Sequence, residues 1–409
     1  MNSSFEQIVV EQLAAKHDDK HESGYVVHLP RTQHSYLGVG IRQEIAVWTD
    51  RVSLRTPGQE VLLKLEADPF EQVVALMDAS LPSVWMVSPD LVRASRDPSL
   101  PLIWCLQPEQ ETELPESAFA TADNIPLSLK SGNPGWVSES DSVFLERLHV
   151  AIARLQAAPE GKIILTRPYE KHVGEQDILK LFTRFAAMEP SAAGSHFFRL
   201  GRHVESLGCS PENVFELIDG MLSFDVVAAT RGIADDPAVD AQWLAALKAD
   251  PKERREHLMA LARYQGRIES LIEPCTLNFE KHMDVLQLGR VRHLYSRLSG
   301  RLRSDLTWLK LLKSSFPALG SYPEELQAWN DRETTPLRFY GGVWGRVGPA
   351  GTDARFYLNL RAALKVDETL YTQGGVGVIV ESEPDKELLE VKNKLRALMQ
   401  AVALWEQAV

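Results

Sequence analysis

Residues 375–394 have the sequence GVGVIVESEPDKELLEVKNK, which is the most informative stretch of the chain. A run of glycine and β-branched residues predicts a strand, and Pro384 marks the start of a helix. Offsets of three and four residues place Glu387, Glu390 and Lys394 on one face of that helix. Such a face can contribute to a cation site beside an anion site, or it can be a solvated face with one ion pair. This stretch alone leaves both interpretations open.

The segments around this stretch predict more strands and helices, in blocks rather than in strict alternation. Capping and apolar periodicity predict a helix from Ser140. The dipeptide Asp219-Gly220 predicts a hairpin turn. The blocks favour an α+β fold with large antiparallel sheets flanked by helices. The predicted strands are 36–41, 46–48, 82–87, 162–167, 212–218 and 221–227, with an antiparallel meander at 339–345, 354–361 and 371–380; further helices are predicted at 241–271 and 384–407, and a connection at 114–136.

Composition narrows the classes of partner. The chain has 409 residues, with 44 Lys and Arg against 56 Asp and Glu, for a net charge of −12. This balance argues against nucleic acid or an anionic membrane as the main partner, so an anionic ligand needs a local cluster of basic residues. Cys105, Cys209 and Cys275 are odd in number and widely spaced, which fits the reducing cytoplasm. No apolar run approaches 18 residues. Nothing in the sequence indicates an oligomer, so a monomer is expected.

Eight short motifs occur in an order that resembles the chorismate-utilising enzymes, which include isochorismate, salicylate, anthranilate and aminodeoxychorismate synthases. The resemblance implies the fold of anthranilate synthase component I and chorismate as the substrate. It also implies a chorismate-binding catalytic domain at 136–409, with a divergent N-terminal portion, 1–135, packed on the same body. The motifs are KIILTR at 162–167, CSPE at 209–212, VAATR at 227–231, KERREH at 252–257, VRHL at 291–294, FYGG at 339–342, NLR at 359–361 and the stretch 375–394.

The resemblance assigns acid–base roles to Lys162 and Glu212. Lys162 matches a general base that takes a proton from water, for which it must be desolvated enough to be neutral part of the time. Glu212 matches a general acid, and a carboxyl group needs a raised pKa for that task at neutral pH. The alternatives are a solvated lysine at a strand edge and an ordinary carboxylate at the start of a hairpin.

The resemblance also implies a Mg2+ site and a set of substrate contacts. Carboxylate oxygens suit a hard cation that keeps some of its water, and the matching residues are Glu256, Glu387 and Glu390. Arginine suits the substrate carboxylates, although Arg361 could instead extend from a strand to solvent, and His293 could be a structural histidine. The implied substrate-binding residues are Ala228, Thr230, His293, Leu319, Tyr340, Arg361, Gly375, Gly377 and Lys394.

Two positions indicate the reaction within this family. Ammonia users of the anthranilate type tend to have glutamine at the position of Lys162, and aminodeoxychorismate synthases have lysine at the position of Ala228. The segment FPALGSYP at 316–323 resembles isochorismate synthases more than salicylate synthases. We therefore expect a Mg2+-dependent isochorismate synthase that serves menaquinone or siderophore synthesis. A salicylate synthase and a catalytically silent chorismate-binding homologue stay as alternatives.

Three positions depart from the family pattern. Ala229 and Val376 replace a glycine and an alanine, and Val391 replaces a threonine. An added methyl group near a ligand costs about 1–3 kcal/mol through overpacking. These departures therefore predict a slow enzyme, an altered substrate or a binding protein. A metal hydrolase built on Glu256 and His257 is disfavoured, because the chain lacks a second histidine at ligand spacing.

Overall fold

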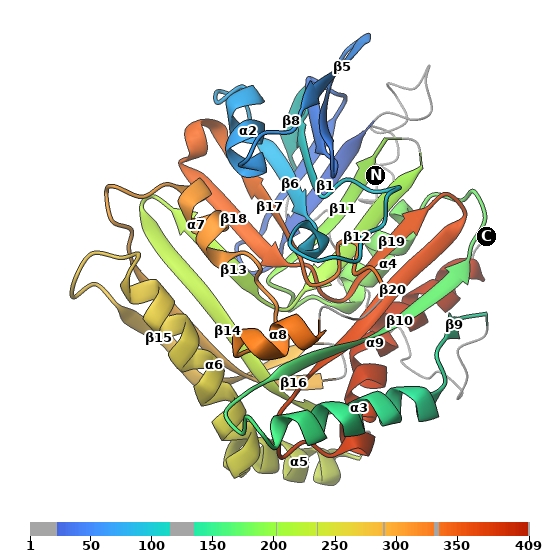
Figure 1. The fold of residues 1–409 in the computed structure, drawn as a ribbon, viewed down its shortest axis with the longest axis vertical. Helices are drawn as coiled ribbons and strands as arrows, with labels where there is room; N and C mark the ends of the chain where they lie inside the picture. The colour runs from blue at the N-terminus through green and yellow to red at the C-terminus, as the bar shows by residue number, and fades with distance from the viewer. Residues whose placement is uncertain are drawn as a thin grey trace, which may run out of the picture.

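Two large antiparallel sheets form the centre of the computed structural model, which describes residues 23–114, 135–201, 203–234, 236–288, 291–330 and 335–407 (Figure 1). Neighbouring strands pair antiparallel throughout both sheets. The predicted α+β class with large antiparallel sheets is confirmed. No helix in the described ranges is both long and apolar enough to cross a bilayer.

Sheet I has nine strands and sheet II has eleven. In spatial order, sheet I contains β8 (Gln110–Glu113), β2 (His34–Val39), β1 (Gly24–Leu29), β11 (Gly194–Leu200), β12 (Val204–Ser210), β19 (Ala362–Val366), β20 (Thr369–Val378), β10 (Ile163–His172) and β9 (Val137–Ser138). Sheet II contains β15 (Asn278–Leu288), β16 (Val291–Arg301), β14 (Met221–Gly232), β13 (Asn213–Ile218), β18 (Asp353–Leu358), β17 (Val343–Val347), β6 (Ser83–Val87), β7 (Ile103–Gln107), β3 (Gln43–Val47), β4 (Arg51–Thr56) and β5 (Gln59–Lys64).

Three hydrophobic clusters make this a four-layer arrangement. Tyr25 of β1 and Trp344 of β17 belong to one buried cluster, so the two sheets pack face to face. The outer face of sheet I is covered by α4 (Leu179–Met188) and part of α9 (Pro384–Glu406), and that of sheet II by α2 (Pro69–Leu76), α6 (Pro251–Glu269) and α7 (Trp308–Ser315). Helices α3 (Asp141–Leu155) and α8 (Glu324–Asn330) pack with α9 against β10 and β20.

In the order of the described strands the chain changes sheet four times, and two of these crossings are adjacent. Between β12 and β13 it runs from sheet I to sheet II, and between β18 and β19 it returns. Two hydrogen bonds link these crossings. Cys209 N donates to Arg361 O at 3.1 Å, and Ser210 Oγ donates to Leu358 O at 2.6 Å. Glu212 lies in the first crossing and Arg361 in the second. Residues 149 positions apart in sequence (361 − 212) therefore lie at one junction.

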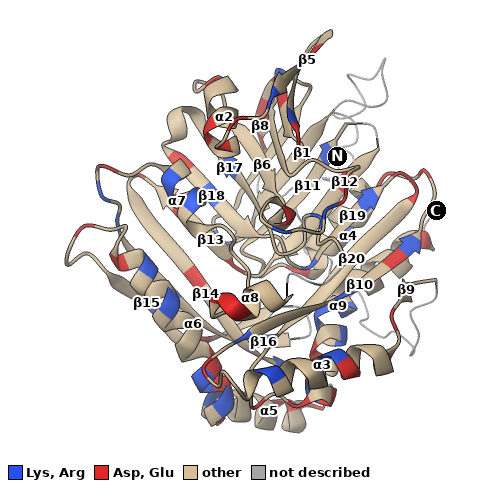
Figure 2. Cartoon of the chain, in the orientation of Figure 1, with Lys and Arg blue, Asp and Glu red and all other residues tan. Residues whose placement is uncertain are grey.

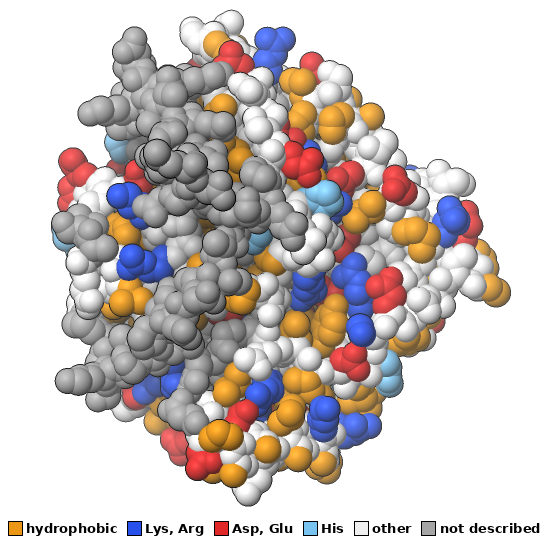
Figure 3. Space-filling model, turned by 180° about the vertical axis from the view of Figure 1, so that it is seen from behind, with side chains coloured by type: hydrophobic (Ala, Val, Ile, Leu, Met, Phe, Trp, Pro, Cys, Tyr) orange, Lys and Arg blue, Asp and Glu red, His pale blue; other side chains and the backbone are white. Residues whose placement is uncertain are grey.

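Local signals explain most helix boundaries. The Ser140 and Asp250 side chains accept hydrogen bonds from the first-turn backbone amides of α3 and α6, and Pro384 begins α9. The predicted helical region over 241–271 is confirmed and consists of two helices, because Asp250 ends α5 (Pro237–Ala249) and caps α6 before Pro251. Charged side chains are concentrated on these outer helices and on loops (Figure 2). On the described part of the rear face, acidic and basic side chains are interspersed (Figure 3).

The predicted antiparallel meander at 339–345, 354–361 and 371–380 is wrong. Strands β17 and β18 pair within sheet II, whereas β20 pairs with β19 and β10 in sheet I. Tyr340 precedes β17 and Arg361 follows β18, so neither lies on a strand. The prediction failed because the crossing after β18 has no strong turn signal. Of the predicted connection at 114–136, residues 115–134 lie outside the described residues.

The strands before residue 135 complete both sheets. Strand β1 pairs with β11 in sheet I, and β6 pairs with β17 in sheet II. The division at residue 135 stays a prediction.

Candidate active site

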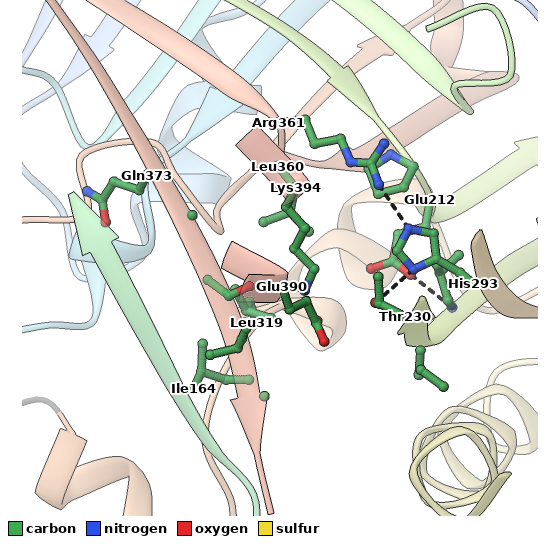
Figure 4. Close-up of a pocket in the computed structure, with 18 of the residues that line it drawn as sticks. Ile164, Glu212, Thr230, His293, Leu319, Leu360, Arg361, Gln373, Glu390 and Lys394 are labelled. Carbon is green, nitrogen blue, oxygen red and sulfur yellow. Dashed lines mark hydrogen bonds and ion pairs between the residues drawn. The ribbon is translucent and has the colours of Figure 1, made fainter. Parts of the chain in front are cut away.

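An open cavity lies at the junction of the two sheets, with about 840 Å3 of empty space that includes open solvent (Figure 4). Every predicted site residue except Glu387 lines it. Lys162 and Glu212 therefore face one cavity. The predicted residues on its wall are Lys162, Glu212, Ala228, Thr230, Glu256, His293, Leu319, Tyr340, Arg361, Gly375, Gly377, Glu390 and Lys394.

Glu212 is held at its backbone and at its side chain. Its carbonyl oxygen accepts from Ser210 Oγ at 2.9 Å, and its Oε2 accepts from Val227 N at 3.0 Å. Burial and the nearby Asp225 carboxylate raise the pKa of Glu212 to about 8, despite the opposing effects of Val227 N, Lys162 and Lys394. Glu212 can therefore carry a proton at neutral pH, which is the state a general acid needs.

Lys162 lies beside a carboxylate rather than in an apolar wall. Its Nζ is 3.2 Å from Glu256 Oε1, and both side chains are mostly buried. Burial alone would lower the pKa of Lys162, but the charge and hydrogen bond of Glu256 outweigh it and raise the pKa above its ordinary value. The expectation of a lysine neutral part of the time is wrong for this arrangement, because the sequence did not reveal the pairing with Glu256.

The glycines of β20 make room for side chains that enter the cavity. A Cβ on Gly377 would lie 2.0 Å from Lys162 Cε, and a Cβ on Gly375 would lie 2.8 Å from Tyr340 Oη. Gly375 also accepts a hydrogen bond from Lys394 Nζ at 3.0 Å through its carbonyl oxygen. These glycines thus position Lys162, Tyr340 and Lys394, in addition to any backbone contact with a ligand.

Replacing Gly377 with alanine is expected to displace Lys162 and to reduce turnover about 100-fold, since a shift of about 1 Å in a reacting group can cost that much. Steady-state kinetics would measure this effect. Gly266→Ala is the matched control, because a Cβ at that position of α6 meets nothing within 4 Å. Equal losses in both variants, or none in Gly377→Ala, would contradict the role assigned to this glycine.

Arg361, His293 and Thr230 form a hydrogen-bonded chain along one wall (Figure 4). Arg361 Nη2 lies 2.9 Å from His293 Nε2, and His293 Nδ1 lies 3.0 Å from Thr230 Oγ1. Burial, Arg361 and Lys394 lower the pKa of His293 well below its ordinary value. His293 is therefore neutral, with Nε2 as the acceptor and Nδ1–H as the donor to Thr230.

The other side of Arg361 contacts Glu189, which the sequence analysis did not identify. Arg361 Nη1 is 3.4 Å from Glu189 Oε2, and Glu189 is only 2% exposed. Arg361 itself takes a φ of 47°, which is unusual for a residue with a side chain. This anchoring turns the guanidinium toward the cavity, and the alternative of a strand arginine extending to solvent is ruled out because Arg361 is 6% exposed. No local pattern around Glu189 could have revealed the contact.

Comparison with known proteins agrees with this arrangement. The family model described as chorismate binding enzyme matches residues 81–400. The chain belongs to this family. A curated relative, anthranilate synthase component 1 of Streptomyces coelicolor, is 31% identical over 284 residues, which are 68% of this chain and 55% of the relative. The chain thus spans about half the length of the curated relatives it matches.

Two solved structures of family enzymes share the fold. The menaquinone-specific isochorismate synthase of Escherichia coli has a TM-score of 0.72 at 16% identity, covering 97% of this chain and 91% of that one. Anthranilate synthase component I of Streptococcus pneumoniae has a TM-score of 0.71 at 17% identity, covering 90% of this chain and 92% of that one. At such identities the likeness concerns the fold alone.

The predicted metal-binding carboxylates of this family member converge, but each is paired with a lysine. Glu256 pairs with Lys162, Glu390 with Lys394 at 2.7 Å, and Glu387 with Lys252 at 3.4 Å. Burial and Glu390 raise the pKa of Glu387 to about 7, and Glu387 lies behind the cavity wall. Within the described ranges no three His, Cys, Asp or Glu side chains stand in ligating positions. Carboxylate oxygens are suitable ligands for Mg2+, but these carboxylates can bind it only after their ion pairs with the lysines are broken.

The family departures lie in different surroundings. Ala229 lines the cavity in the left-handed region, with a φ of 61° at a bulge of β14, which favours glycine. Val391 is fully buried in the cluster beneath α9 and does not line the cavity. Val376 lies in the same cluster. Ala229 and Val376 are thus the two departures that line the cavity.

Proposed function

We propose that this chain is a Mg2+-dependent isochorismate synthase that converts chorismate to isochorismate. The observation that carries the proposal is the placement of Lys162 and Glu212 on one cavity, with a small Ala228 beside them. An amine and a protonated carboxyl can remove and deliver protons in one displacement. No lysine occupies position 228 to act there as a nucleophile.

Cationic side chains would hold the substrate. Arg361 and Lys394 face the cavity and can bind carboxylates, while neutral His293 links Arg361 to Thr230 through its two ring nitrogens. Lys394 also pairs with Glu390 and Gly375 O, so its position is set before a ligand arrives. Preorganised charges of this kind lose little conformational entropy on binding.

Proton transfer would run from one wall of the cavity to the other. Lys162 takes a proton from water as the water oxygen bonds to ring carbon C2. The ring double bonds shift, the bond from C4 to its hydroxyl breaks, and Glu212 protonates the departing oxygen. Lys162 can accept a proton only after losing the one that Glu256 stabilises. Glu256 must therefore be engaged elsewhere in the reactive state.

Bound Mg2+ would supply positive charge for the ring carboxylate, with Glu256 and Glu390 as its ligands and Glu387 supporting them. We expect Mg2+ at 100 times its Kd to stabilise the wild type by about 2.7 kcal/mol. Glu256→Gln and Glu390→Gln should largely lose this gain in thermal melts with and without EDTA. Glu160→Gln is the control, since this side chain is 83% exposed. The same gain in all variants would mean that Mg2+ binds elsewhere.

The curated relatives favour a second candidate, an anthranilate synthase, because several of them are anthranilate synthase component 1. Incubating the protein with chorismate and Mg2+, with and without ammonium, separates the possibilities by chromatography. Isochorismate supports the proposal. Salicylate with pyruvate supports a salicylate synthase, anthranilate formed only with ammonium contradicts the role of Lys162, and unchanged chorismate indicates a silent binding protein.

A further inference from the structure

A buried carboxylate lies behind Glu212 and is held by groups that no family motif includes. Asp225 of β14 is 0% exposed, and its two oxygens have four partners. Oδ1 accepts from Tyr295 Oη at 2.9 Å and Arg297 Nη1 at 2.8 Å. Oδ2 accepts from Arg31 Nη1 at 2.6 Å and from Asn213 N at 3.3 Å. Both oxygens of Asp225 are therefore fully used as acceptors.

The same groups hold the segment that carries Glu212. Arg31 Nη2 donates to Pro211 O at 3.0 Å, on one side of Glu212. On the other side, Asn213 exchanges two hydrogen bonds with Asp225, through Asn213 N and through Asn213 Oδ1, which accepts from Asp225 N at 2.7 Å. One arginine and one carboxylate thus contact both neighbours of Glu212.

Arg31 reaches this site from a distant part of the chain. It lies in the turn between β1 and β2, and its guanidinium stacks over the Tyr295 ring at 5.4 Å. The family model begins at residue 81, so Arg31 lies outside the matched region. The contact joins the N-terminal strands directly to the candidate active site.

We propose that Arg31 and Asp225 are positioning residues for Glu212: together they hold the segment 211–213 on both sides of its carboxyl, and their opposite charges act in opposite directions on the proton that this carboxyl carries. The functional meaning rests on the proposed function, in which Glu212 gives up that proton. The charged and titratable groups facing Glu212 are Asp225 from β14, Lys162 before β10, Lys394 from α9 and Tyr264 from α6. Asp225 opposes ionisation of Glu212, whereas the two lysines favour it.

The two residues should act in opposite directions on the protonation of Glu212. Asp225→Asn removes a negative charge and leaves Arg31 and Arg297 in excess, so Glu212 ionises more easily. Arg31→Met removes a positive charge from Asp225, so Glu212 holds its proton to higher pH. Arg31→Lys keeps the positive charge but cannot contact both Asp225 and Pro211 O. This variant therefore distinguishes the effect of the charge of Arg31 from its effect on the position of the 211–213 segment.

Infrared difference spectroscopy can follow the protonated carboxyl of Glu212 through a pH titration, with Glu212→Gln identifying the band. We expect the midpoint to fall by at least about one pH unit in Asp225→Asn, because a like charge at short range shifts a carboxyl by about that much. The midpoint should rise in Arg31→Met and should be unchanged in Arg31→Lys. Turnover should nevertheless fall about 10- to 100-fold in Arg31→Lys, because the segment that carries Glu212 is displaced. Arg51→Met, at an exposed ion pair with Asp50, is the control.

An unchanged midpoint in Arg31→Met, or shifts of the same sign in Arg31→Met and Asp225→Asn, would overturn the inference. If Asp225→Asn does not fold, the two Arg31 variants decide alone, since Arg31 is 27% exposed. The infrared titration does not require turnover. If the midpoints shift as expected but the protein leaves chorismate unchanged, the proposed function is refuted. The inference about Arg31 and Asp225 would still hold.

Discussion

Lys162→Ala is expected to lower the conversion of chorismate at least about 100-fold while chorismate still binds, because general acid–base groups typically contribute 10²- to 10⁴-fold. Lys162 lines the same cavity as Glu212, and its contact with the substrate would be made chiefly during the proton transfer. Steady-state kinetics and calorimetric titration with chorismate measure the two quantities separately. Lys386→Ala, on the exposed side of α9, is the matched control.

Glu212→Gln should cause a loss of the same order, because glutamine keeps the shape but has no acidic proton to deliver. The double variant should be little worse than either single variant, since two groups that act in one displacement do not contribute additively. Glu160→Gln again serves as the control. Full activity in either single variant would remove that residue from the mechanism, and multiplicative losses would indicate separate steps.

Arg361→Met is expected to have the second large effect, on binding and on stability together. It removes the guanidinium that faces the cavity and leaves Glu189 buried without its partner. Breaking a buried pair from one side costs about 3–5 kcal/mol. Chorismate affinity should fall more than about 100-fold, because charged hydrogen-bonded pairs at a binding site cost 2–5 kcal/mol when truncated.

The stability loss in Arg361→Met should depend on pH. Burial raises the pKa of Glu189 even beside Arg361, and without Arg361 the pKa rises further. A carboxyl whose pKa is raised by folding costs stability above its folded pKa and costs none below its unfolded pKa. Chemical denaturation should therefore show the variant approaching the wild type as the pH falls.

The double variant Arg361→Met with Glu189→Gln separates the two effects. Neutralising Glu189 should restore most of the lost stability but none of the lost affinity. Recovery of chorismate binding in the double variant would mean that Arg361 only offsets the charge of Glu189. An unchanged stability in Arg361→Met would mean that the pair contributes nothing to folding.

Local sequence was enough to predict the parts of this protein that depend on near neighbours. The cap Ser140, the Asp219-Gly220 turn and Pro384 act over a few residues, and the elements they bound are present. The order of motifs indicated the family, and thirteen of the fourteen predicted site residues face one cavity, as counted from the lining set. Their chemical roles stay predictions.

Only the tertiary structure decided how these residues are paired. Lys162 meets Glu256 across 94 positions, Arg361 meets Glu189 across 172, and Arg31 meets Asp225 across 194. These partners come from distant elements of the fold, and no local periodicity encodes a contact at such separation. A pKa depends on the charges and burial around a group rather than on its neighbours in sequence. The sequence therefore determined which groups this protein has for its chemistry, while the fold decided which of them hold a proton.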